Sequence, residues 1–174
     1  MATLRDLQRA ILPAARPVGS AGLTGEAARR DVTWVRVLRA RVPAFEALET
    51  GDLAIVPAAS LAVVAPRPPQ TDELAEALAR ARVPAVVLVE SDEGADALEA
   101  LGRAAVSRGL TVLRQPRTDP VALERSVIGY LVNRRAELQH RAAELEAELT
   151  ASRSSDAGST AWRLPSVRSS EGRS

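Results

Sequence analysis

The chain has 174 residues and a formal net charge of +1, and its basic residues are all arginine, because no Lys occurs. It has no Cys and a single His. These counts exclude disulfides and thiolate sites, and also Schiff bases, Walker-type phosphate loops and Ser-Lys dyads. We therefore expect a protein that is not an enzyme, with no catalytic residues, no metal site and no cofactor.

The bulk composition favours a soluble domain with an aliphatic core. Hydrophobic residues make up 46% of the chain, but aromatic residues only 2%, so Ala, Val and Leu must build the core. No apolar run approaches the roughly 20 residues of a membrane span, and the N-terminus has no signal-peptide pattern. The near-neutral charge provides no field for nucleic acid or a membrane surface. We expect a cytoplasmic protein that does not bind membranes.

The first elements are a capped helix and a strand. Thr3 is placed to cap a helix over residues 4–12, with Asp6 three residues further on. Residues 31–38 predict a strand whose two faces are both largely apolar, which is typical of a mostly buried strand. Arg36 on this strand is expected near a sheet edge or beside a partner.

The next segment predicts two short strands and a helix. Residues 53–56 form a short apolar run typical of a buried strand, and residues 61–65 are a second candidate strand. Thr71 is expected to cap a helix, with Asp72 and Glu73 in its first turn, where acids interact well with the helix dipole.

A regular alternation follows. Residues 84–89 are continuously apolar, which is typical of a central parallel strand. A helix is expected to start at Ser91 or Asp92 and to stop at Gly109, and residues 110–113 predict the next strand.

This order of elements predicts the fold class. The β-α-β-α-β-α spacing is that of right-handed crossovers, so we expect an α/β fold with a mostly parallel sheet covered by helices. A long C-terminal helix follows the sheet, with Asp119 as its expected cap and Pro120 in its first turn. The predicted organisation is an α/β regulatory domain over residues 1–119, a dimerisation helix over 120–150 and a disordered tail over 151–174.

The long helix carries a heptad pattern. Leucines recur at d, and a positions hold apolar residues except for Arg135. This pattern favours a coiled coil and a homodimer, whose parallel or antiparallel orientation stays open. In the alternative interpretation, the first half of the helix packs on the sheet and the second half is merely amphipathic. His140 falls at the exposed f position, which favours a surface histidine. The predicted dimerisation residues are Ile128, Leu131, Leu138, Leu145 and Leu149.

Ligands of parallel sheets usually bind beyond the carboxyl ends of the strands. Here these ends lie near residues 56–60, 90–92 and 114–115. A small metabolite is the expected ligand. The arginine-rich stretch around Arg36 could hold a small anion, but with one aromatic neighbour and no helix to enter a groove it does not favour direct nucleic-acid binding. The candidate ligand-binding residues are Asp52, Ser60, Ser91, Asp92 and Arg36.

Several segments in this order resemble one known family. They are Thr3-Leu4-Arg5-Asp6-Leu7, Val18-Gly19 with Gly22-Leu23, Val32-Thr33-Trp34-Val35-Arg36-Val37, Leu48-Glu49-Thr50-Gly51-Asp52-Leu53, Val83-Pro84-Ala85-Val86-Val87 and Gly109-Leu110-Thr111-Val112-Leu113. Together they resemble the N-terminal domain of PucR-type transcription factors, regulators of purine catabolism, over about residues 3–149. The resemblance implies a sensory or regulatory α/β domain, usually followed by further modules and a helix-turn-helix.

The sequence thus predicts a non-enzymatic, ligand-sensing regulatory domain that dimerises through its last helix. Nothing after Thr150 has the pattern of a DNA-binding domain, so we expect this chain to lack the output module. Two alternatives stay open. One is a small nucleotide- or phosphometabolite-binding module of an enzyme complex, and the other is a purely structural interaction protein.

Overall fold

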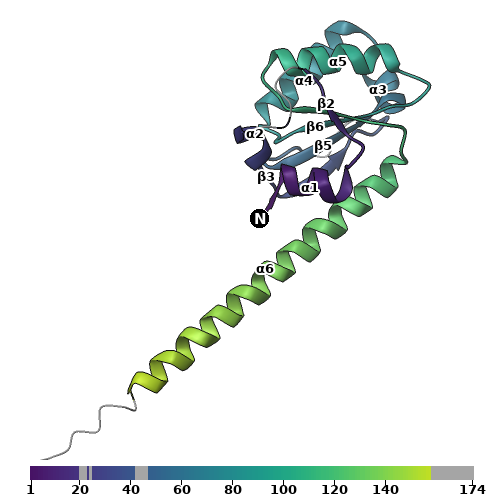
Figure 1. Ribbon diagram of the computed structural model, residues 1–174. Helices are drawn as coiled ribbons and strands as arrows, with labels where there is room; N and C mark the ends of the chain where they lie inside the picture. The colour runs from purple at the N-terminus through teal and green to yellow at the C-terminus, as the bar shows by residue number, and fades with distance from the viewer. Residues whose placement is uncertain (20–22, 24, 42–46, 158–174) are drawn as a thin grey trace, which may run out of the picture. The chain divides into compact units, whose positions relative to one another are not determined.

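A five-stranded sheet forms the centre of the protein in the computed structural model, which describes residues 1–19, 23, 25–41 and 47–157, the last eight by their backbone alone (Figure 1). The strand order is β2-β7-β6-β5-β4. Four neighbouring strands are parallel and β2 joins them antiparallel, which confirms the predicted α/β class. The strands are β2 (Arg16–Pro17), β4 (Trp34–Val37), β5 (Asp52–Pro57), β6 (Val86–Val89) and β7 (Val112–Gln115).

Helices cover both faces of this sheet (Figure 1). One face packs against α3 (Ala58–Val64), α4 (Pro68–Arg80) and α5 (Ala95–Ser107). The other packs against α1 (Leu4–Ile11) and the first part of α6 (Pro120–Ala157). The remaining elements are α2 (Gly25–Arg29) and a two-stranded antiparallel sheet of β1 (Ala2–Thr3) and β3 (Asp31–Val32).

The alternation of side chains along the central strands explains why two helical layers are needed. Every residue of β5 and β6 is buried. Ala54 and Leu88 belong to the core under α4 and α5, whereas Ile55 and Val87 belong to the core under α1 and α6. A strand that is apolar on both faces is stable only when both faces are covered, because side chains alternate across a sheet.

The N-terminal helix begins at the predicted cap. The Thr3 hydroxyl donates a hydrogen bond to an Asp6 carboxylate oxygen at 2.7 Å and accepts one from the Asp6 amide at 3.2 Å. The Thr3 amide also donates to the Asp6 carboxylate at 3.4 Å. Together with the bond from the Asp6 amide to the Thr3 hydroxyl, this contact forms a capping box, which satisfies amides that the helix itself leaves unpaired. The hydrogen bond from the Thr3 side chain lowers the pKa of Asp6 below its usual value of 3.8.

Two strand predictions need correction. The strand expected over residues 31–38 divides into β3 and β4, which belong to different sheets. Residues 61–65 lie mostly in helix α3, with Leu61 fully buried and Val63 66% exposed. A short apolar run does not distinguish a strand from a helix by itself. The strand predicted at 110–113 is β7, which begins two residues later.

Two helix starts also differ from expectation. Helix α4 begins at Pro68, so Thr71 lies inside it, where its hydroxyl donates to the Pro68 carbonyl at 2.8 Å. Proline is tolerated in the first turn because the amide it lacks would be unpaired there. Helix α5 begins at Ala95, after Gly94, and not at Ser91 or Asp92. Those residues stay in the loop that follows β6.

Helix α6 has two differently placed halves. Leu123, Val127 and Leu131 are buried in the core of the unit Met1–Ala136, and Ile128 packs against that core. From residue 135 to 149 every side chain is exposed. Leu131 is therefore buried inside its own chain and Ile128 is partly buried there, so the exposed predicted dimerisation residues are Leu138, Leu145 and Leu149.

The helix is also longer than predicted. It continues past Thr150 to Ala157, so residues 151–157 are helical and not disordered as expected. The rest of the predicted tail, 158–174, and Gly22 of the N-terminal turn lie outside the described residues. Within the described ranges, no helix combines the length and the apolar character needed to cross a bilayer.

We predict that Asp6→Asn lowers the free energy of unfolding by about 1 kcal/mol near neutral pH, because the charged acceptor of the capping box is lost. The folded-state pKa of Asp6 is depressed, so its contribution is present above the unfolded pKa and is lost as pH falls through the folded value. Urea unfolding at about pH 7 and about pH 3 should show the deficit shrinking in acid. A deficit of equal size at both pH values would contradict this role. The exposed Asp31→Asn serves as control.

Candidate functional site

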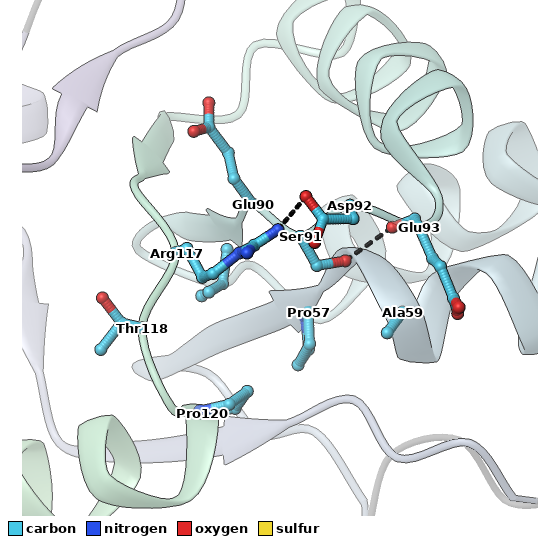
Figure 2. Close-up of a pocket in the computed structure, with 10 residues that line it drawn as sticks. Pro57, Ala59, Glu90, Ser91, Asp92, Glu93, Arg117, Thr118 and Pro120 are labelled. Carbon is cyan, nitrogen blue, oxygen red and sulfur yellow. Dashed lines mark hydrogen bonds and ion pairs between the residues drawn. The ribbon is translucent and has the colours of Figure 1, made fainter.

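A pocket of about 300 Å³ lies at the carboxyl edge of the parallel sheet (Figure 2). It is formed where the chain leaves three neighbouring strands, β5, β6 and β7. We call it the carboxyl-edge pocket. Such an edge is the usual place for ligands in α/β sheets, as the sequence predicted. The residues that line it are Pro57, Ala59, Val89, Glu90, Ser91, Asp92, Glu93, Arg117, Thr118 and Pro120.

Short-range polar contacts connect the loops of this pocket. Asp92, from the loop after β6, forms an ion pair with Arg117, from the loop after β7, as Figure 2 shows. In the first of these loops, the Ser91 hydroxyl donates to the Glu93 carbonyl at 2.6 Å. The Glu90 amide donates to the Gln115 carbonyl at 3.0 Å, which continues the strand pairing to the rim.

The loop after β6 is also fixed by a close backbone approach. Gly94 has a φ of +80°, and a Cβ atom there would lie 2.3 Å from the Ala58 carbonyl oxygen. Only glycine combines this left-handed conformation with so short an approach. Gly94 therefore allows the loop after β6 to lie close to α3. A side chain at position 94 would push the loop away from that helix.

The pocket carries exposed charge and few unused hydrogen-bonding groups. The Asp92 side chain is 86% exposed and that of Arg117 is 63% exposed, so their ion pair is solvated and contributes little stability. Thr118 donates to the Pro116 carbonyl at 3.0 Å and accepts from Gln115 at 3.2 Å. No imidazole lines the pocket to activate Ser91.

The structure separates the five predicted ligand-binding residues. Ser91 and Asp92 line the carboxyl-edge pocket, but Ser60 lies on α3 and is not part of its lining. Asp52 begins β5, so it lies at the opposite, amino edge of the sheet, and Arg36 is bonded to it. Asp52, Arg36 and Ser60 therefore do not line the carboxyl-edge pocket, and Arg36 lines a separate cavity of about 220 Å³ beside β4.

Asp52 and Arg36 form a structural pair instead. The Asp52 side chain is 4% exposed and accepts hydrogen bonds from Arg36 Nε at 3.2 Å and from the Glu49 amide at 3.0 Å. Trp34 lies directly beside Asp52 in the parallel register of β4 and β5. This buried carboxylate thus ties the edge strand β4 and the preceding loop to the centre of the sheet.

The sequence analysis missed Arg117, Thr118 and Pro120 as pocket residues. Strand β7 ends at Gln115, two residues later than expected, so the loop that contributes to the pocket is also later. The helix-start signal Asp119-Pro120 gave the one available indication, because it marks the end of that loop. The Asp119 carboxylate does cap α6, by accepting the Val121 amide hydrogen at 3.0 Å.

Comparisons with protein-family models, with curated proteins and with solved structures found no match to this chain. Among the residues described, no three His, Asp or Glu side chains come together in a way that would hold a metal ion. Inferences about function therefore rest on the carboxyl-edge pocket and on α6.

We predict that Asp52→Ala lowers the free energy of unfolding by about 3 kcal/mol, because it leaves the Glu49 amide and Arg36 without their acceptor. The matched control is Asp72→Ala, which breaks the exposed ion pair to Arg108 at 3.5 Å and should cost under about 1 kcal/mol. Chemical denaturation measures both. Equal losses in the two variants would show that Asp52 has no special structural role.

Proposed function

We propose that this protein is a non-enzymatic regulatory domain that forms a homodimer through α6 and senses a small metabolite in the carboxyl-edge pocket. The observation that carries the proposal is the row of exposed leucines on the second half of α6. The resemblance of the sequence to PucR-type regulators supports the regulatory role, and it suggests purines as the first metabolites to test.

The exposed leucines form a seam at heptad spacing. Leu138, Leu145 and Leu149 are 37%, 60% and 61% exposed in the single chain. Leu138 and Leu145 occupy d, and Leu149 occupies a, with Ala142 at the a position between them. An apolar stripe of this kind is stabilised by burial against an identical stripe, as in a two-stranded coiled coil. We call these residues the leucine seam.

The charges beside the leucine seam suit a second copy of the same chain. Arg141 occupies a g position and Glu146 the following e position. In a parallel dimer, the g residue of one helix lies near the next e residue of its partner, so Arg141 and Glu146 would attract each other across the interface. Arg141 already interacts with Glu137 of its own helix at 3.9 Å, and the intermolecular contact adds to this one.

The length of the leucine seam supports a weak association. Because Leu131 is used by the core, the seam available to a partner spans only about two heptads. The burial of so short a seam exceeds the free-energy cost of association by only a small amount. We therefore expect a dimer dissociation constant in the micromolar range. The first half of α6 favours assembly, since its packing on the sheet nucleates the helix.

The pocket and the seam belong to connected parts of the chain. Arg117, Thr118 and Pro120 line the pocket, and Pro120 is the first residue of α6. A ligand that contacts these residues therefore acts on the segment that fixes the start of the dimerisation helix. This connection favours a sensing role over a passive one.

A purely structural role is the second candidate, and one observation favours it. Asp92 and Arg117 pair with each other, and the hydroxyls of Ser91 and Thr118 both have partners, so these four side chains do not need a ligand to satisfy them. In that case the domain only carries the leucine seam, and dimerisation occurs with no ligand dependence.

We predict that Leu138→Asp weakens self-association by about tenfold or more, because it places a charge in the apolar seam. Sedimentation equilibrium of the full chain over micromolar to high micromolar concentrations measures the effect. Ala147→Asp, at the outward f position of the same helix, is the control and should leave association unchanged. A wild-type protein that stays monomeric at high micromolar concentration would refute the dimer.

For the pocket, we predict that a purine such as xanthine or hypoxanthine raises the thermal midpoint by about 5–10 °C at a hundred times its dissociation constant. Ala59→Leu, which adds bulk to the pocket lining, should abolish the shift. Val63→Leu on the same helix is exposed and should not. Dimerisation that persists while no purine shifts the midpoint would favour the structural role.

A further inference from the structure

A second cavity, of about 370 Å³, lies at the sheet edge where β2 and β7 meet α5. It shares no lining residue with the carboxyl-edge pocket. Three arginines line it, one from each of these elements: Arg16, Arg103 and Arg114. Its volume is suited to a compact small molecule. We call it the arginine cavity.

The sheet register places two of these arginines side by side. Arg16 of β2 and Arg114 of β7 are direct partners in the antiparallel pairing. Directly opposite residues lie on the same face with Cβ atoms about 5 Å apart, where like charges repel each other. On its other side Arg114 is in register with Leu88, which belongs to the core under α5. The two arginines therefore lie on the α5 side of the sheet, together with Arg103.

The positive charge of this cavity is only partly neutralised. Arg114 Nε lies 3.6 Å from a Glu90 oxygen, and this buried nitrogen has no hydrogen-bond partner in the described chain. Arg16 and Arg103 form no ion pair with any residue that the structure describes. Glu99 is the one acid in the lining. The two acids, Glu90 and Glu99, are fewer than the three arginines, so the cavity keeps an excess of positive charge.

We propose that the arginine cavity is an anion-binding site for a small phosphate monoester. Two neighbouring guanidinium groups and a third from α5 can donate several charge-assisted hydrogen bonds to one phosphoryl group. A phosphate monoester carries a charge near −2 at neutral pH, and the three arginines outnumber the two nearby acids, Glu99 in the lining and Glu90 beside Arg114. The site goes beyond the proposed function, because it requires neither the dimer nor the carboxyl-edge pocket.

The walls of the cavity point to an organic phosphate more than to the free ion. Pro17, Val18 and Gly102 line it beside the arginines and offer an apolar surface. Gly102 is close to the sheet, since a Cβ there would lie 3.2 Å from a Leu88 methyl carbon. A compact apolar group attached to the phosphoryl oxygen would bury surface against these walls and gain affinity.

Calorimetric titration of the full chain with phenyl phosphate, at ionic strength held constant with sodium chloride, tests the proposal. We expect one saturable site per chain, and phenyl phosphate should bind more tightly than inorganic phosphate. The double variant Arg16→Gln, Arg103→Gln should raise the dissociation constant by about tenfold or more. The control Arg9→Gln removes an exposed arginine of α1, on the other sheet face, and should change it less than about twofold.

A second measurement separates loss of binding from loss of folding. Without ligand, Arg16→Gln should leave the thermal midpoint unchanged or raised, because it relieves the repulsion with Arg114. Absence of saturable binding, or equal affinities in the wild type and the double variant, would overturn the site. Succinate binding more tightly than phenyl phosphate would overturn its assignment to a phosphate and assign it to dicarboxylates.

Discussion

The central strands are buried on both faces, and this burial dictates where the helices must pack. Strands β5 and β6 present only buried residues, so neither face can be left to water. The crossover helices α4 and α5 cover one face. The opposite face is covered by α1 and by the first turns of α6, in which Leu123 and Val127 enter the core. A helix that looks like an appendage in the sequence is thus part of the fold.

Helix α6 therefore completes the core and, in our proposal, also forms the dimer interface. Up to Leu131, the apolar residues of the heptad pattern pack on the sheet of their own chain. From Leu138 onward, in our proposal, they pack against a second chain. Because Pro120 lines the carboxyl-edge pocket, ligand binding and helix placement share one loop. The arginine cavity shares no lining residue with that pocket and lies where β2 and β7 meet α5. The domain therefore offers two separate places at which small molecules could be recognised.

Periodicity and cap chemistry predicted most of the fold, because they depend on neighbouring residues. The Thr3 cap, the continuous apolar run of β6 and the Asp119-Pro120 start of α6 were all visible in the sequence. Features that depend on distant contacts were not. The pairing of Arg16 with Arg114, the close approach of Gly94 to Ala58 and the burial of Asp52 require the strand register. The sequence therefore predicted the edge of the sheet at which the candidate site lies, but only some of the residues that line it.

Amide hydrogen exchange measured at several protein concentrations tests the division of α6 most directly. The amides of residues 123–131 should exchange only through global unfolding at every concentration, because they belong to the core of the domain. Those of residues 138–149 should exchange quickly in dilute protein and more slowly as the concentration rises, since a partner covers the leucine seam. Fast exchange of the second segment at all concentrations, or unprotected amides in the first, would contradict the two roles assigned to this helix.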